Sequence, residues 1–161
     1  MGHLVYSKEE AYHALAERLS RFPIGAVINE TLMGILRLLY TEKEAAVGSK
    51  FPIRPRPFAD IVEISGIGKK ELAPILENMA KKGLVVDIPR KGTTYYVLSP
   101  MVVGFFEYTL MRAEGANLKE LAHLFERYFH EAGVAEELFG SKTKMFKTLV
   151  YERMIPAFVE T

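Results

Sequence analysis

The sequence predicts a mainly α-helical α+β protein built on a winged helix-turn-helix, and the stretch Phe58–Pro100 carries most of that prediction. Two helical patterns meet there at Gly66 and Gly68, and two short β-prone runs follow the second helix. A helix, a turn, a second helix and a hairpin in that order are typical of a winged helix. We therefore expect a winged-helix domain with an N-terminal helix over residues 1–100, and a helical extension over residues 101–161 packed on it.

Four segments precede the helix-turn-helix pattern. The run Glu9–Leu19 is amphipathic, whereas Thr31–Tyr40 is apolar on nearly every side and predicts the central buried helix. Thr41 is followed by acidic residues, which predicts an N-cap and a short helix through Val47. Phe51–Pro57 contains three prolines, so we expect an extended spacer there.

The second helix of the motif is expected over Lys69–Lys82. Its apolar residues recur at the spacing of one buried helical face: Leu72, Ile75, Leu76 and Met79. Pro74 should kink this helix or delay its start, because proline removes a backbone hydrogen bond. The hairpin is expected from the β-prone runs Leu84–Val86 and Tyr95–Leu98, with its turn at Pro89–Gly92.

The sequence beyond Pro100 predicts further helices. Met101–Met111 is apolar and aromatic, and Asn117–Glu131 is strongly amphipathic. The expected apolar stripe of the latter consists of Leu118, Leu121, Ala122, Phe125 and Phe129. Glu136–Phe139 predicts a further helical turn, while Phe146–Thr161 is β-prone in places and ends without a capping signal.

Composition narrows the functional classes. The 161 residues carry 21 basic and 20 acidic side chains, a net charge of +1, which argues mildly against a dedicated nucleic-acid binder. No apolar run approaches the ~20 residues that a membrane-spanning helix needs, and the N-terminus lacks an export signal. The chain has no cysteine, so these residues cannot form disulfides, thiolate metal sites or a cysteine nucleophile. We expect a cytoplasmic protein without membrane contact.

A DNA-binding role would place the second helix in the major groove and the hairpin tip on the backbone. The candidate nucleic-acid-binding residues are Lys69, Lys70, Asn78, Lys81, Arg90 and Lys91. Asn78 alone suits bidentate reading of adenine. Glu71 and Glu77 lie on the same helix and would repel phosphates, so their exposure would argue against DNA.

A second interpretation concerns the same glycines. Ile64–Gly68 followed by Lys69 and Lys70 resembles the turn of a helix-hairpin-helix element, in which backbone amides hold a DNA phosphate without reading the sequence. The β-prone runs that follow favour the winged helix instead.

Metal and enzyme signatures are weak. Glu120, His123 and Glu126 share one helical face and His130 lies one heptad after His123, but a di-iron site needs a second such helix. We interpret these residues as an ordinary charged surface. Gly66 and Gly68 join two helices and follow no strand, so they do not form a phosphate-binding loop. No nucleophile elbow is present, and we do not predict an enzyme.

Several segments, taken in order, resemble a family of prokaryotic ferredoxin-type iron–sulfur proteins. The resemblance covers most of Ala11–Tyr108 and rests on order and spacing more than on any single motif. The segments that carry it are Leu15–Ala26, Ile35–Val47, Ile75–Ile88, the Tyr95-Tyr96 strand, Met101–Tyr108 and, more loosely, Leu121–Phe129 and Arg153–Pro156.

The resemblance implies a winged-helix region followed by a ferredoxin-type module that binds [4Fe–4S] clusters through Cys-x-x-Cys-x-x-Cys runs. This chain departs from that pattern because it has no cysteine, so no cluster ligand can be assigned to it. We expect these residues to be the N-terminal part of a longer protein, acting as a non-catalytic accessory or regulatory domain of an electron-transfer protein. Its partner would be another protein or its own ferredoxin module. The alternative is a standalone transcriptional regulator that dimerises through its terminal helices and binds DNA.

Overall fold

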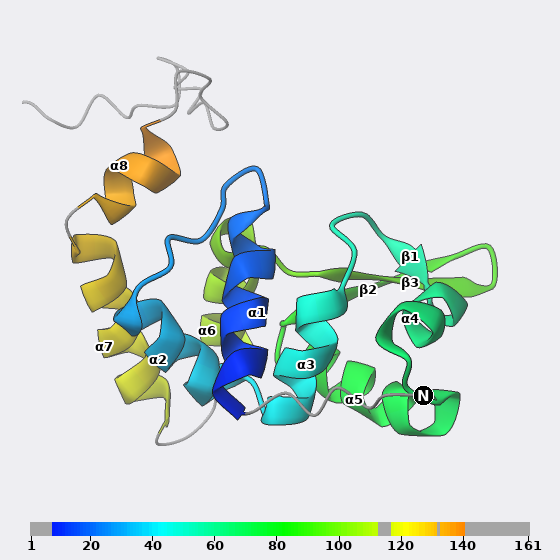
Figure 1. Cartoon of the computed structure of the whole chain (residues 1–161). Coiled ribbons are helices and arrows are strands. Elements are labelled where there is room, and N and C mark those ends of the chain that lie inside the picture. The colour runs from blue at the N-terminus through cyan, green and yellow to red at the C-terminus, as the bar shows by residue number, and fades with distance from the viewer. Residues whose placement is uncertain (1–7, 113–116, 132, 141–161) are drawn as a thin grey trace, which may run out of the picture.

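The protein is a mainly helical α+β structure with a small antiparallel sheet (Figure 1). The computed structural model describes residues 8–112, 117–131 and 133–140. The order of the elements is α1 (Lys8–Ser20), α2 (Glu30–Leu39), α3 (Glu42–Lys50), β1 (Arg56–Pro57), α4 (Phe58–Ser65), α5 (Lys69–Lys81), β2 (Val85–Arg90), β3 (Thr93–Leu98), the π-helical segment η1 (Met101–Phe105), α6 (Phe106–Arg112), α7 (Asn117–His130) and α8 (Val134–Phe139).

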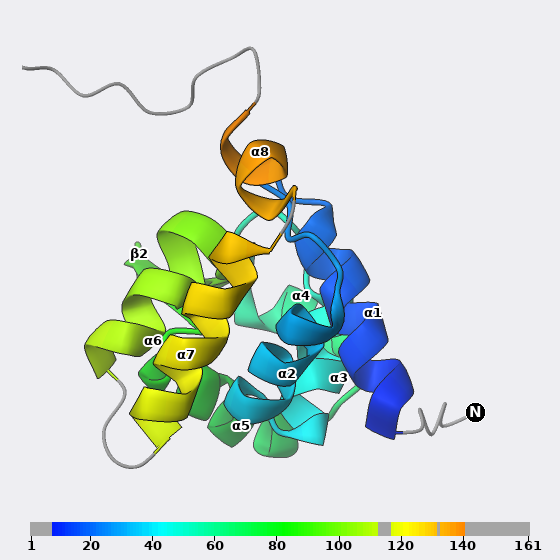
Figure 2. The same ribbon diagram turned by 90° about the vertical axis from the view of Figure 1, so that its left-hand side faces the viewer.

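Helices α1, α2, α3, α6 and α7 form one side of the molecule, while α4, α5 and the sheet form the other (Figure 1). Helix α1 packs along α3, and α2 lies between α1 and α7 (Figure 2). The backbones of α2 and α7 come close where Leu124 packs on Gly34, because glycine leaves room for a neighbouring side chain.

The predicted central helix is confirmed as α2. Its buried residues are Thr31, Leu32, Met33, Ile35, Leu36 and Leu39. The predicted N-cap at Thr41 is also confirmed, because Thr41 and Glu44 form a reciprocal capping box at the start of α3. Helix α3 continues to Lys50, three residues beyond the expected end.

Helix α5 begins at Lys69, immediately after Gly68, so Pro74 does not delay its start. The residue lies within the helix and on its exposed side, where the missing N–H removes one hydrogen bond without ending the helix. Of the apolar face predicted for this helix, Leu72, Leu76 and Met79 are buried, and Ile75 is half-buried against the core.

The sheet has three antiparallel strands in the order β1-β3-β2, one strand more than the sequence predicted. The additional strand β1 is two residues long and pairs Arg56 with Tyr96 and Pro57 with Tyr95. It lies at the edge of the sheet, where a proline without an N–H is tolerated.

The hairpin turn is tighter than expected. Arg90 pairs with Thr93, so only Lys91 and Gly92 connect β2 to β3. Both have positive φ, 48° and 78°, which is the requirement of a two-residue type I′ turn. Pro89 and Arg90 therefore belong to strand β2 and not to the turn.

Helix α7 faces the core with a set of side chains that differs partly from the predicted stripe. Leu121 and Phe125 are buried as predicted, but Ala122 is exposed and Tyr128 is fully buried. The Tyr128 hydroxyl accepts a hydrogen bond from Val27 N (2.7 Å) and donates one to Val27 O (2.9 Å). Burial is the largest cause that raises the pKa of Tyr128 to about 12.

One continuous hydrophobic core joins the first hundred residues to the helices that follow. Phe105 is fully buried, and its ring meets those of Tyr40 and Phe125, each at 6.4 Å between centroids. At the end of α7, Glu131 accepts hydrogen bonds from Asn29 and Thr31. The described parts of residues 101–131, which are 101–112 and 117–131, are thus packed on the N-terminal helices. The β-prone tail, Phe146–Thr161, lies outside the described residues.

Candidate functional site

The candidate DNA-binding residues at the start of α5 project from an open turn. Helix α4 ends at Gly66 in the left-handed conformation, and α5 starts after Gly68 without a side-chain cap. Lys69 and Lys70 follow directly and are exposed. Within the described part of the chain, neither of them lies within 4 Å of a carboxylate.

Further along α5, two candidate residues have partners within the molecule. Asn78 donates its amide hydrogen to Glu44 Oε1 (2.6 Å), so this donor is occupied and turned toward α3. Lys81 Nζ lies 2.7 Å from the carboxylate of Glu77, one helical turn earlier. Of the candidates on α5, only Lys69 and Lys70 offer their charges to a partner without first breaking a contact.

Two carboxylates are exposed on α5. The side chains of Glu71 and Glu77 are 60% and 67% exposed. Each meets one lysine: Glu71 binds Lys43 of α3 at 3.1 Å, and Glu77 binds Lys81, which lowers the pKa of Glu77 through a side-chain hydrogen bond. Both acidic residues of the second helix are therefore exposed, and this is the result that we expected to argue against DNA binding.

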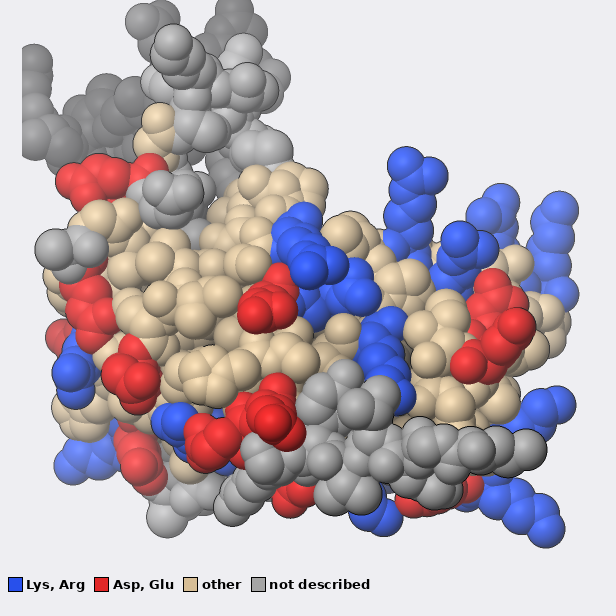
Figure 3. All heavy atoms as spheres, in the orientation of Figure 1, with Lys and Arg blue, Asp and Glu red and all other residues tan. Residues whose placement is uncertain are grey.

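The hairpin tip carries Arg90 and Lys91, both exposed. The structure adds two arginines beside the sheet that the sequence did not single out, Arg54 before β1 and Arg56 within it. Figure 3 shows basic side chains gathered at the sheet end of the molecule. The signal in the sequence was the Arg-Pro-Arg-Pro run of the spacer, whose pairing with β3 could not be foreseen.

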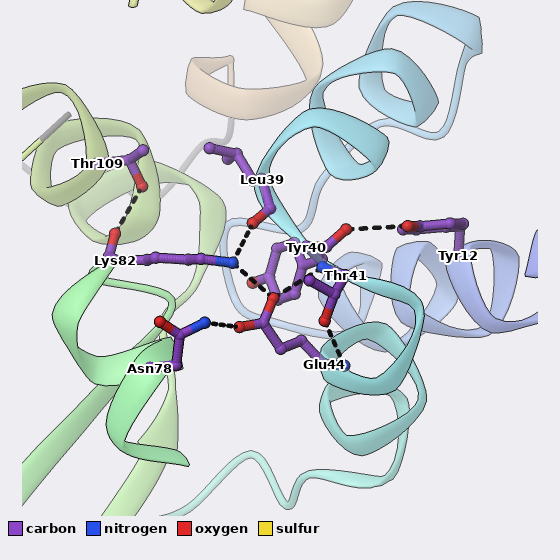
Figure 4. Close-up of polar contacts among 8 residues, drawn as sticks. All are labelled: Tyr12, Leu39, Tyr40, Thr41, Glu44, Asn78, Lys82 and Thr109. Atoms are coloured by element: carbon purple, nitrogen blue, oxygen red, sulfur yellow. Dashed lines mark hydrogen bonds and ion pairs between the residues drawn. The ribbon is translucent and has the colours of Figure 1, made fainter. Parts of the chain in front are cut away.

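A buried polar junction centred on Glu44 connects the end of α2, the start of α3 and the end of α5 (Figure 4). The Glu44 side chain is only 3% exposed, and Lys82 Nζ lies 2.7 Å from its Oε2. Lys82 Nζ also donates to the carbonyl of Leu39 (3.1 Å). Asn78 Nδ2 and the backbone N–H of Thr41 complete the set of donors to Glu44. A buried carboxylate requires such donors, since an unpaired one would be strongly destabilising.

This junction ties the start of α3 to the end of α5, and α6 joins it through a second contact. Thr109 Oγ1 donates to the carbonyl of Lys82 at 3.2 Å. Nearby, Tyr40 is fully buried, and burial is the largest cause that raises its pKa. Its hydroxyl has no hydrogen-bond partner among the described residues. The arrangement is structural, because Glu44 is closed to solvent and both of its carboxylate oxygens already accept hydrogen bonds.

The histidine-containing face of α7 was the candidate metal site. His123 Nδ1 lies 3.7 Å from Glu126 Oε2, and both side chains are 69% exposed. Across residues 8–112, 117–131 and 133–140, no group of three or more histidine or acidic side chains is placed to hold a metal ion. No helix in these ranges is both long and apolar enough to cross a bilayer.

Comparison with known proteins adds no relative: no family model, no curated protein and no solved structure matches the chain. The function is therefore inferred from the geometry of the described residues.

Proposed function

We propose that this protein is a winged-helix domain that acts through contacts with other protein surfaces and not through catalysis. The order helix, strand, helix, helix, hairpin, from α3 to β3, supports the winged helix. The short strand β1 adds support, since it completes a three-stranded antiparallel sheet beside the hairpin.

The exposed carboxylates of α5 are the observation that favours a protein partner. A recognition helix enters a groove lined with phosphates, and Glu71 and Glu77 would be repelled there. Helix α6 offers apolar side chains instead, because Tyr108 is 40% and Met111 82% exposed. Exposed apolar residues beside a packed core suit a protein contact.

The proposed context is an electron-transfer protein with [4Fe–4S] clusters, and this part of the proposal rests on the resemblance of the sequence to ferredoxin-type proteins. The chain has no cysteine, so the clusters would be bound by residues outside these 161. The winged helix would then be an accessory or regulatory domain that contacts the cluster-binding module or its redox partner.

Reading the native gene past the codon for Thr161 tests this context. We expect Cys-x-x-Cys-x-x-Cys runs in the same reading frame, and an iron–sulfur absorbance in the protein expressed from the whole gene. A stop codon directly after Thr161 would contradict the proposal and leave the domain as a protein in its own right.

DNA binding is the second candidate function, and one observation favours it. Lys69, Lys70, Arg90 and Lys91 are exposed and, among the described residues, form no ion pair. These four residues lie in the two elements, recognition helix and wing, that contact DNA in winged helices. A regulator of this kind would bind the phosphate backbone with little reading of bases, because the Asn78 amide is already bonded to Glu44.

Fluorescence anisotropy with a labelled duplex, measured over a range of salt concentrations, tests this candidate. If it is right, replacing Lys69, Lys70, Arg90 and Lys91 together by alanine should abolish measurable binding at moderate salt. Residual binding at low salt should show a slope of log K against log[salt] that is shallower by about 3 to 4, one per lost phosphate contact. The matched control is Lys43→Ala, which removes an exposed cation that is already paired. Unchanged binding by the quadruple variant would exclude this surface.

A further inference from the structure

A small hollow lies where the second half of α1 meets the last turn of α3. Its volume is about 130 Å³. The residues that line it are Ala14, Glu17, Arg18, Arg21, Ser49 and Lys50. The lining thus combines three cationic residues with one acidic residue, and Figure 3 shows basic side chains gathered over this part of α1 and α3.

The three cations of the hollow differ from most of the others in the helices. Among the other basic side chains, a carboxylate lies within 4 Å of Arg37, Lys43, Lys81, Lys82 and Arg127 in or next to the helices, and of Arg56 in β1. Lys69, Lys70, Arg90 and Lys91 form no such pair among the described residues. Within the described ranges, Arg18, Arg21 and Lys50 meet none, although Glu17 lies in the same wall. Their positive charge is therefore not neutralised by the protein itself.

Two of the three cations are held in place by backbone carbonyls. Arg18 Nε donates to Ser49 O at 3.1 Å, and Lys50 Nζ donates to Ser65 O at 3.0 Å. The terminal Nη groups of Arg18 make no hydrogen bond among the described residues, so this planar pair of donors remains available. Fixing Nε reduces the conformational freedom that would be lost when an anion binds.

Helix dipoles alone do not explain this cluster. A cation in the last turn stabilises the negative end of a helix, which accounts for Arg18 in α1 and Lys50 in α3. It does not account for Arg21, which follows the end of α1 and turns to the same hollow. It also does not explain why the two helices bring three cationic residues together around a single acidic one, Glu17.

We propose that this hollow binds a phosphoryl group, either as inorganic phosphate or as the head of a phosphomonoester. A phosphate dianion matches the excess of positive charge, and its oxygens accept paired hydrogen bonds from an arginine fork. The volume suits one phosphoryl group, since pockets for whole drug-sized ligands are about 300–1,000 Å³. Any larger part of the ligand would extend into solvent. This site is separate from α5 and the hairpin, so it does not depend on the proposed function.

The test is an NMR titration of the 161-residue chain with inorganic phosphate at constant ionic strength. We expect saturable shifts of Arg18, Arg21 and Lys50. Arg18→Gln and Arg21→Gln should each weaken binding by about tenfold, the loss of one charge contact near the surface. Glu17→Gln should tighten it by about threefold, because it removes the one repelling carboxylate. Lys43→Gln, on the opposite end of α3, is the matched control and should change nothing.

The expected increase in phosphate affinity of Glu17→Gln cannot result from poor folding, because a poorly folded variant does not bind more tightly. A parallel titration with glycerol 3-phosphate distinguishes the two possible ligands, the free phosphate ion and a phosphomonoester. Binding of both ligands supports a phosphomonoester site, and binding of inorganic phosphate alone supports a site for the free ion. Shifts that do not saturate, or that weaken equally in Lys43→Gln and Arg18→Gln, would overturn the proposal.

Discussion

Lys82→Met should destabilise the protein by about 3 kcal/mol at neutral pH, because it leaves the buried carboxylate of Glu44 without its cation. Asn78 and the Thr41 N–H would still donate to that carboxylate, which places the effect at the lower end of the usual range for broken buried pairs. Urea unfolding followed by circular dichroism measures the loss. The double variant Glu44→Gln with Lys82→Met removes both charges and should recover most of the stability.

The neighbouring residue Lys81 supplies a matched control. Its ion pair with Glu77 has the same length, 2.7 Å, but both side chains are about two-thirds exposed. Lys81→Met should therefore change the free energy of unfolding by no more than about 0.5 kcal/mol. Equal losses in Lys81→Met and Lys82→Met would show that burial of the Glu44 pair is not what matters.

Phe105→Ala should be still more damaging, with an expected loss of about 3–5 kcal/mol. The ring is fully buried between Tyr40 and Phe125, so its removal opens a cavity between the N-terminal helices and α7. Urea unfolding should show one transition at a lower midpoint. Tyrosine fluorescence should report the same midpoint as circular dichroism, because Tyr40 and Tyr128 lie in the same core.

Met111→Ala is the control for that experiment, since Met111 lies in the adjoining helix α6 but is 82% exposed. Its effect should stay within about 0.5 kcal/mol. Two separate transitions in either variant would contradict a single core, and would favour an extension that folds independently of residues 1–100.

The elements that the sequence predicted well are those whose signals are local. The apolar run Thr31–Tyr40 could only be a buried helix, and the capping pattern at Thr41 depends on residues within one turn. The helices α4 and α5 and the hairpin β2–β3 were also predictable from the sequence, because glycines and β-prone runs separate them. Local hydrogen-bonding and periodicity therefore account for most of the secondary structure.

The features that escaped prediction depend on distant partners. Two residues of a proline-rich spacer became strand β1 only because Tyr95 and Tyr96 lie beside them. Tyr128 was left out of the apolar stripe of α7, yet it is buried because its hydroxyl finds the backbone of Val27. A polar atom at a helix face can be buried when a partner satisfies it, and no local pattern records that partner.

In the candidate site, too, the local features were predictable, whereas those that depend on distant residues were not. Lys69 and Lys70 are exposed because the helical periodicity places them outward, and Arg90 and Lys91 are exposed because they lie at the tip of the hairpin. The bond from Asn78 to Glu44, in contrast, links residues 34 apart and removes a donor that the sequence offered to DNA. The hollow formed by α1 and α3 likewise appears only when the two helices are packed together.

The pair of hydrogen bonds between Val27 and Tyr128 also has a consequence for biosynthesis. The two residues are 101 positions apart, and α7 covers α2 at the same place. A ribosome that adds about 5–20 residues per second needs roughly 5–20 s to make the intervening chain. During that interval the nascent α2 carries apolar side chains that have no α7 to cover them. A chaperone that holds apolar segments therefore has time to bind α2 before the fold can close.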